Sequence, residues 1–519
     1  MATMTDKFLI CILIALINIL IRWCVSLNDY SGAGKPPMFG DYEAQRHWSE
    51  ITYNLPVKEW YTNSSQNDLM YWGLDYPPLT AYHSWICGFI AHWIDPDWVA
   101  LNESRGFESE GHKLFMRYSV ILADVLVYFP AVHLFFDQLK SLKTSDQMRG
   151  VFMMLLYPGL ILIDHGHFQY NCISLGLTLL AVVCLTGGRD LVGSILFCLA
   201  LNYKQMELYH AFPFFSYLLG SCFASAKENW FLKLVKIGLV VIVTFVVCWY
   251  PYLSDKESAL QVLHRVFPFA RGLYEDKVAN IWCSLSVVIK LRQLLTVNQI
   301  VIMCLVTTFV AVLPSAINLM LRPSIDRFKL ALINSSLAFF LFSFHVHEKS
   351  ILIPALAVCL FIPERPMSSL WFLLISTFSM LPLLIKDGLL IAFIALMVIY
   401  IFLYMSAFPM SATGNKSWQL KLCRPVFYLS LTGAVALTIA VVAMEPPPHL
   451  PDLFPVLISA FSCGHFVLFF LYYNYVQLSI GAPKPSVKEM EKEKVQYFPK
   501  GSSKTGPQDI SHLVRKKRI

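Results

Sequence analysis

Charged side chains are scarce in this sequence. Only 14% of its 519 residues are Asp, Glu, Lys or Arg, whereas 56% are hydrophobic. Soluble domains carry about 25% charged residues, so the composition excludes an ordinary soluble domain. It predicts an all-α protein that crosses a membrane many times.

Motifs that bind nucleotides or metal ions are also missing. The sequence contains no P-loop, no Rossmann glycine fingerprint and no zinc-ligand spacing, so we expect neither a nucleotide-binding fold nor a metal or other cofactor. The thirteen cysteines form no CxxC pair, and most lie inside apolar runs, as do Cys198 and Cys248. They predict buried thiols and no disulfide framework. Much of the net charge of +7 is local to a basic tail, which favours contact with anionic lipid and gives no case for a nucleic-acid partner.

Apolar runs predict about fourteen spans in a single transmembrane domain, residues 1–475, followed by a basic tail, residues 476–519. The first span is expected at 8–27, where Arg22 would reach the interface with its long side chain. Residues 79–94 are short for a span and rich in Trp and Tyr, so we expect a helix lying in the interface. The other spans are expected near 114–136, 151–163, 172–186, 191–201, 210–223, 234–252, 298–321, 330–344, 351–362, 369–384, 389–406, 427–443 and 453–475.

Loop charges predict which side of the membrane each loop faces. With this set of spans, the short basic loops fall on one side, which the positive-inside rule makes cytosolic, together with both termini. The chain ends Lys516-Lys517-Arg518-Ile519, a pattern that fits a dilysine retrieval signal of the endoplasmic reticulum. The opposite face is then luminal and holds the large loops 28–113 and 253–297. The sequons at Asn63 and Asn102 lie on that face, where we expect N-glycosylation.

The dense polar clusters of the chain, apart from the tail, gather on the luminal face, where they include residues 164–171 and 386–388. Charged groups at membrane depth are costly, so such clusters are candidates for function, although they could also pair and brace the bundle. A luminal transferase that used a lipid-phosphate sugar would need a base and cations that hold a leaving phosphate. Acids in the first loop are Asp41, Glu43 and Asp75, and possible phosphate partners are Lys204, His264, Arg265, Arg271, Lys277, His345, His347 and Lys349.

Asp41 is the strongest candidate for the base. It follows Gly40, which would let the backbone turn sharply, and it lies at the start of a helix expected at 41–55 that Pro56 ends. Glu43 would point some 200° away from Asp41 on that helix, and Asp75 precedes a double proline that suits a structural or acceptor-binding role. Other interpretations stay open: Asp41 could cap the helix, and Glu348 could simply pair with Lys349.

Several stretches resemble one enzyme family. Residues 40–48, 71–80, 164–171, 267–283 and 346–349 are similar to the dolichyl-phosphate-glucose-dependent glucosyltransferases of the endoplasmic reticulum membrane. The resemblance implies a type C glycosyltransferase (GT-C) fold, Asp41 as the catalytic carboxylate, and transfer of glucose with inversion to a lipid-linked high-mannose oligosaccharide. The substrate-binding residues that we carry over or infer are Asp75, Glu43, Arg46, His47, Trp72, Asp164, His165, His167, Lys204, Arg265, Arg271, His347, Glu348 and Lys349.

Two alternatives remain. Residues 43–48 and 71–74 are closer to the family members that add the first glucose in an α-1,3 linkage than to those that add the second. A membrane protein with polar midplane residues could also be a lipid or solute transporter. Transporters typically show internal repeats, and none is visible in this sequence.

Overall fold

The computed structural model describes residues 4–224, 229–267, 277–409 and 418–481, and every element within them is a helix. Two units divide the chain, residues 1–477 and 478–519, and the site described below lies in the first. The helices are α1 (Met4–Ser26), α2 (Asp41–Asn54), η1 (Val57–Glu59), α3 (Pro78–Ile94), η2 (Pro96–Val99), α4 (Glu110–Ala123), η3 (Asp124–Tyr128), α5 (Phe129–Gln138), α6 (Thr144–Leu155), α7 (Pro158–Ile161), η4 (Leu162–Phe168), α8 (Asn171–Thr186), α9 (Asp190–Tyr203), η5 (Gln205–His210), α10 (Ala211–Ala224), α11 (Trp230–Trp249), η6 (Tyr250–Tyr252), α12 (Lys256–Val266), α13 (Ile281–Leu285), α14 (Leu291–Leu294), α15 (Val297–Leu321), α16 (Ile325–Phe342), η7 (Glu348–Ile351), α17 (Leu352–Cys359), α18 (Pro366–Phe378), α19 (Leu381–Lys386), α20 (Leu390–Ala407), α21 (Trp418–Ala443) and α22 (Leu453–Ser479).

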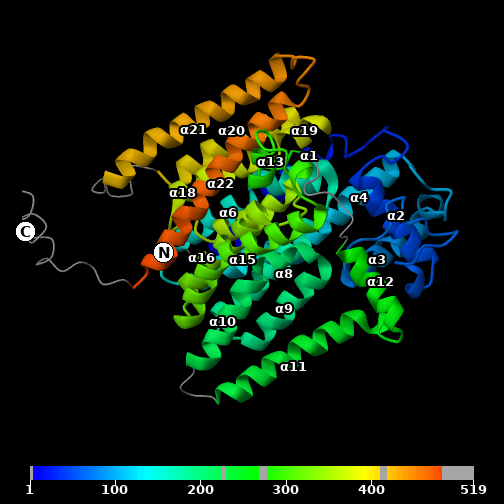
Figure 1. Cartoon of the computed structure of the whole chain (residues 1–519), viewed down its shortest axis with the longest axis horizontal. Helices are drawn as coiled ribbons and strands as arrows, with labels where there is room; N and C mark the ends of the chain where they lie inside the picture. The colour runs from blue at the N-terminus through cyan, green and yellow to red at the C-terminus, as the bar shows by residue number, and fades with distance from the viewer. Residues whose placement is uncertain (1–3, 225–228, 268–276, 410–417, 482–519) are drawn as a thin grey trace, which may run out of the picture. The chain divides into compact units, whose positions relative to one another are not determined.

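Long apolar helices confirm the prediction of a multi-pass membrane protein. Within the described residues, eight helical stretches are long and apolar enough to cross a membrane: Lys7–Ser26, Glu110–Gln138, Thr144–Phe168, Trp230–Tyr252, Val297–Leu321, Leu390–Ala407, Cys423–Ala443 and Leu453–Ser479. Shorter apolar helices, including α8, α9 and α18, lie between them (Figure 1). The number of fourteen spans stays a prediction.

Arg22 does not reach the interface, so that expectation is wrong. Its side chain is completely buried, and its Nε donates to Oδ2 of Asp124 at 2.6 Å. The same carboxylate oxygen lies 2.6 Å from Nε2 of His165. Because the bundle itself supplies a carboxylate, the arginine side chain turns inward and α1 is tied to η3 and η4.

The loop between α1 and α4 is a folded layer built on α2 and α3. These helices pack side by side (Figure 1), and Gly88 permits the approach, because a Cβ there would lie 2.4 Å from the carbonyl oxygen of Ser49. Trp48 and Ile51 of α2 pack with Val262 and Val266 of α12, which joins the two large loops. The helix predicted at 41–55 is confirmed as Asp41–Asn54, with Leu55 at its C-cap.

The cysteines agree with the prediction of free thiols. All thirteen fall within the described residues, all are free, and ten of them are buried. Cys198 of α9 and Cys248 of α11 are among the buried ones. They pack as small apolar side chains, and packing and hydrogen bonds hold the helices together.

Candidate active site

Three donors converge on one oxygen of Asp41. Its Oδ2 lies 2.6 Å from Nζ of Lys349, 3.0 Å from Nε2 of His167 and 2.5 Å from Nε2 of Gln169. Asp41 begins α2, His167 lies in η4, and Lys349 lies in η7, so the fold joins segments more than 100 residues apart. The Asp41 side chain is 25% exposed, so a ligand can reach it, while His167 is 2% exposed.

The position of Asp41 depends on Gly40 for a reason that differs from our expectation. Gly40 has φ 179°, an extended conformation open to any residue, so no sharp glycine turn occurs there. Gly40 is instead required by close packing, because a Cβ would lie 2.5 Å from the carbonyl oxygen of Ser31. Gly40 also occupies the N-cap position and has no side chain to cap the helix, while the backbone N–H of Asp41 donates to Oγ of Ser31 at 3.4 Å. Asp41 therefore does not cap α2, and its carboxylate faces His167 and Lys349.

His167 bridges two carboxylates. Its Nε2 faces Asp41, and its Nδ1 lies 2.6 Å from Oδ2 of Asp387, whose side chain is 3% exposed. Our candidate set from the sequence omitted Asp387 and Gln169. The signal was present, since both residues belong to polar loops (164–171 and 386–388) that we assigned to the face of Asp41.

The cations beside Asp41 hold it in the ionised form. Burial acts to raise the pKa of the Asp41 carboxyl, but the Lys349 ammonium and the His167 ring outweigh it, so this pKa lies well below its usual value. Burial acts to lower the pKa of Lys349, but Asp41 and Glu348 raise it above the usual lysine value. The resting site thus contains a closed ion pair that opposes proton uptake by Asp41.

A small pocket lies beside Gln169. Its lining residues are Gln45, Tyr76, Thr80, Gln169, Tyr170, Tyr203 and Lys204. Nζ of Lys204 donates to Oδ1 of Asn171 at 2.6 Å and to Oε1 of Gln169 at 3.3 Å, and it lies 5.2 Å from the centre of the Tyr76 ring. Burial, with the charge of Lys349, lowers the pKa of Lys204 to about 8. Gln169 therefore links the pocket directly to Asp41.

Asp164 and His165 hold the η4 segment in place through buried hydrogen bonds. Asp164 accepts hydrogen bonds from Nδ2 of Asn171 at 2.7 Å and from the backbone N–H of Cys172 at 2.8 Å. His165 faces Asp124 within the bundle, as described above. Of the two predicted histidines in this stretch, His167 is therefore the one that contacts Asp41.

Residues 43 to 50 of α2 form a separate buried network. Arg46 lies between two carboxylates, with Nη2 2.7 Å from Glu43 and 2.7 Å from Glu50, and its Nη1 donates to Oγ of Ser104 at 2.6 Å. Nδ1 of His47 lies 3.1 Å from Glu50. The side chains of Arg46, His47 and Glu50 are fully buried. The structure thus places Glu43, Arg46 and His47 inside the loop layer, apart from the Asp41 cluster.

The remaining candidates lie around this core. Arg265 of α12 binds the carbonyl oxygens of Gly73 and Leu74, at 2.7 and 3.2 Å, so it holds the 71–76 segment. Trp72 adds two contacts to that segment, since its Nε1 donates to the carbonyl oxygen of Met38 and its own carbonyl oxygen accepts from Trp48.

Other predicted residues are placed as follows. The carbonyl oxygen of Asp75 accepts a hydrogen bond from Gln205 at 3.1 Å. His347 precedes η7, which Glu348 begins, and its ring lies 5.0 Å from that of His345. Lys277 forms an ion pair with Asp452 at 2.9 Å. His264 is exposed, as are both sequon asparagines, Asn63 and Asn102. Arg271 lies outside the described residues.

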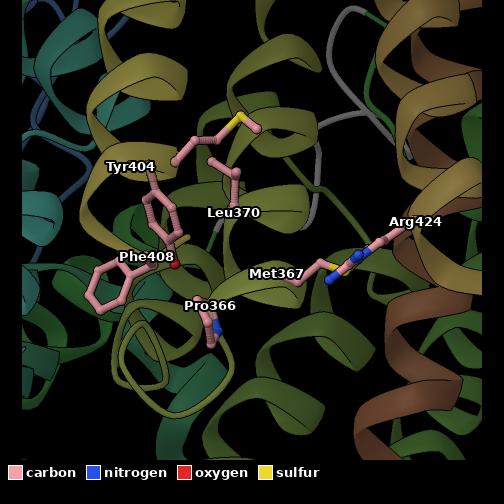
Figure 2. Close-up of a pocket in the computed structure, with 7 residues that line it drawn as sticks. Pro366, Met367, Leu370, Tyr404, Phe408 and Arg424 are labelled. Carbon is pink, nitrogen blue, oxygen red and sulfur yellow. The ribbon is translucent and has the colours of Figure 1, made fainter. Parts of the chain in front are cut away.

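A second pocket lies in a different part of the fold. Figure 2 shows it between α18, α20 and α21, lined by Pro366, Met367, Leu370, Tyr404, Met405, Phe408 and Arg424. The lining is mostly apolar and includes the C-terminal end of α20. Asp387 precedes the N-terminal end of the same helix, which is about 27 Å long at 1.5 Å per residue. This pocket is therefore well separated from Asp41.

Comparison with known proteins identifies the family. The profile of the ALG6, ALG8 glycosyltransferase family matches residues 18–472. The chain is 51% identical over 493 residues to the dolichyl pyrophosphate Man9GlcNAc2 alpha-1,3-glucosyltransferase of Gallus gallus, covering 91% of this chain and 97% of the relative. It is 51% identical to the protein of the same name from Mus musculus, over 89% of this chain and 95% of the relative. It is 47% identical to the probable dolichyl pyrophosphate Man9GlcNAc2 alpha-1,3-glucosyltransferase of Drosophila melanogaster, over 90% of this chain and 98% of the relative. The chain therefore belongs to the ALG6, ALG8 glycosyltransferase family.

Proposed function

We propose that this protein transfers glucose from dolichyl-phosphate glucose to the terminal mannose of the dolichyl-diphosphate-linked high-mannose oligosaccharide, with an α-1,3 linkage and inversion at C1. Membership of the family and the names of its close relatives support this activity. The observation that carries the assignment of the site is Asp41, a partly exposed carboxylate held by Lys349, His167 and Gln169.

Asp41 acts as the general base. It takes the proton of the acceptor hydroxyl while that oxygen forms the new bond to C1 of the glucosyl group. The bond from C1 to the phosphate oxygen breaks, and its electron pair leaves with the phosphate. Phosphate is already a good leaving group and needs charge stabilisation more than a proton. One carboxylate is therefore sufficient, in contrast to the two of an inverting glycosidase.

Lys349 couples donor binding to activation of the base. In the resting site its ammonium pairs with Asp41 and holds the pKa of this carboxyl low, which makes Asp41 a poor base. A donor phosphate offers Lys349 a second anion at the same place. When Lys349 moves toward the phosphate, Asp41 loses a cationic partner and becomes more basic only while the donor is bound.

The pocket beside Gln169 suits a polar part of a substrate. Its aromatic rings can pack against a sugar, and Lys204 can donate to a hydroxyl or a phosphate oxygen. His347, Glu348 and Arg265 remain candidates for further substrate contacts, as do Asp75 and Trp72. We also propose a GT-C fold and a place in the endoplasmic reticulum membrane, because the family resemblance implies both. The segregation of the short basic loops to one side supports a luminal site and cytosolic termini.

A transfer assay in detergent tests this function. The purified protein is incubated with a dolichyl-phosphate glucose analogue and, in parallel, with the unglucosylated and the monoglucosylated lipid-linked oligosaccharide. We expect transfer to the unglucosylated acceptor without added metal. Transfer only to the monoglucosylated acceptor would identify the enzyme that adds the second glucose. Absence of transfer to both, with movement of either lipid across a proteoliposome membrane, would indicate a transporter instead.

A further inference from the structure

Asp387 lies on the far side of the His167 ring from Asp41. Its Oδ2 is 2.6 Å from Nδ1 of His167, and both side chains are nearly fully buried. The opposite ring nitrogen is 3.0 Å from Oδ2 of Asp41. One imidazole thus connects a buried carboxylate to the partly exposed carboxylate that we assign as the base.

The number of N–H donors on the His167 ring limits which carboxylates it can bind. A neutral imidazole has one N–H donor, so it can donate to only one of two carboxylates. Lys349 lies 3.2 Å from Nε2 of His167, and its ammonium would favour a lone pair on that nitrogen. A carboxylate at Nδ1 opposes that effect and favours a ring that donates from both nitrogens. With His167 protonated, the two positive charges of His167 and Lys349 balance the two negative charges of Asp41 and Asp387.

The backbone around Asp387 is held firmly in place. The N–H groups of Asp387 and Leu389 bond to carbonyl oxygens of α19 at 3.2 and 2.8 Å, and the carbonyl oxygen of Lys386 accepts from Nζ of Lys35 at 3.0 Å. The Leu389 side chain packs on Gly166, where a Cβ would lie 2.7 Å from its Cδ1. The turn that carries Asp387 therefore packs on the η4 segment that carries His167.

The geometry points to Asp387 as a positioning residue for glucosyl transfer, which keeps His167 donating to Asp41 so that the base stays oriented when Lys349 turns to the donor. This inference rests on the proposed function. The groups that face His167 are Asp41 from α2, Lys349 from η7 and Asp387 from the turn after α19, with Glu348 next to Lys349. Asp387 would touch no substrate, and its effect would pass through the imidazole alone.

A double-mutant cycle tests this role. Asp387→Asn keeps the size of the side chain but removes its charge, and we expect kcat to fall roughly 10–100-fold with little change in the KM of either substrate, the range seen when a carboxylate that orients a metal-ligating imidazole is removed. His167→Gln should lower kcat at least as much. Because Asp387 acts through His167, the double variant should match His167→Gln within about twofold.

Asp124→Asn is the matched control. Asp124 and His165 form a buried pair of the same 2.6 Å length, but this pair does not contact Asp41. We expect Asp124→Asn to lower thermal stability while kcat per folded molecule stays near the wild-type value. If Asp387→Asn aggregates, Asp387→Glu takes its place, since it keeps the charge and changes only the reach; it should lower kcat less and show the same lack of additivity with His167→Gln.

Several results would overturn the inference or the assignment of the base, in distinguishable ways. Independent, multiplicative effects of Asp387→Asn and His167→Gln on kcat, or wild-type kcat in Asp387→Asn, would refute the positioning role while the proposed function stands. Normal turnover of Asp41→Asn would instead refute the assignment of the base. An effect of Asp124→Asn on kcat equal to that of Asp387→Asn would show that any buried Asp–His pair in the bundle matters to the same degree.

Discussion

Asp41, the first residue of α2, and the network of residues 43–50 that follows it use charge in opposite ways. Asp41 is 25% exposed, and each of its partners comes from another segment of the chain. Arg46 and Glu50 are fully buried, and Arg46 pairs with two carboxylates of its own helix. An ion pair at a partly exposed edge can exchange a partner for a ligand, whereas a buried pair that loses a partner leaves an uncompensated charge. A high density of charged residues therefore does not identify a candidate for the reaction. Partial exposure, together with partners that a ligand can replace, is the better criterion.

Loss of Arg46 should have the largest effect on stability. Arg46→Met leaves Glu43 and Glu50 buried without their cation, which costs about 3–5 kcal/mol. We expect a clear drop in the melting temperature of the purified protein and a low yield. Arg149→Met is the control, because Arg149 forms an exposed pair with Asp146 worth about 0–1 kcal/mol. Equal melting temperatures for the two variants would contradict a structural role for the network.

Loss of Lys349 should affect the reaction more than the fold. On the proposed mechanism, Lys349→Met removes a charge-assisted bond to the donor phosphate worth about 1.5–3 kcal/mol, so kcat/KM for the donor should fall roughly 10–100-fold. Steady-state kinetics at varied donor concentration measure it. Lys233→Met is the matched control, because Lys233 also forms an ion pair with an aspartate, Asp190, at 2.6 Å. A wild-type KM for the donor in Lys349→Met would show that Lys349 does not contact the phosphate.

The pocket lysine predicts a pH effect of moderate size. Burial, with the charge of Lys349, lowers the pKa of Lys204 to about 8, so this ammonium is present below pH 8 and is lost as the pH rises through that value. If Lys204 holds a substrate as a cation, KM should rise up to about tenfold per pH unit above 8. Lys204→Arg keeps its charge and should remove this rise. An unchanged alkaline profile in Lys204→Arg would assign the pH effect to another group.

The smallest expected effect concerns Ser104. Its hydroxyl accepts from Arg46 at 2.6 Å and lies 3.2 Å from Oε2 of Glu50, so Ser104→Ala should cost about 1 kcal/mol of stability. Ser104 is also the third residue of the Asn102 sequon. Asn102→Asp removes the same sequon and leaves the hydroxyl in place, so it should not lower the melting temperature as Ser104→Ala does. Matching melting temperatures would place Ser104 outside the network.

The sequence predicted which residues lie near Asp41 better than it predicted how they pair. Apolar spacing and Pro56 predicted a helix at 41–55, which the structure shows as Asp41–Asn54, and the choice of Asp41 came from its place after Gly40 at the start of that helix. The pairing of His167 with Asp387 could not be read from the sequence, because the two residues are 220 positions apart. The burial of Arg46 could not be predicted for a different reason. A row of charged residues normally indicates a solvent-exposed surface, and the sequence does not show which side chains cover it.

Two errors have simple physical causes. Arg22 was expected at the interface because a long side chain can extend to water, but Asp124 in the neighbouring helix offers a closer partner. Gly40 was expected to supply an unusual backbone angle, whereas it provides space for Ser31. Both features depend on which segments become neighbours, and that information lies in packing between distant parts of the chain.

Single-turnover kinetics of Asp41→Asn test the central claim most directly. Enzyme in excess over donor is mixed with saturating acceptor, and glucose transfer is followed alongside donor binding at equilibrium. Asn keeps nearly the same shape but cannot take a proton, so the transfer rate should fall roughly 10²–10⁴-fold while donor binding is retained. Asp75→Asn should keep a transfer rate nearer the wild-type value in this experiment and should mainly raise the KM for the acceptor when the acceptor concentration is varied. Near-normal transfer by Asp41→Asn together with its loss in Asp75→Asn would show that Asp75, and not Asp41, is the base.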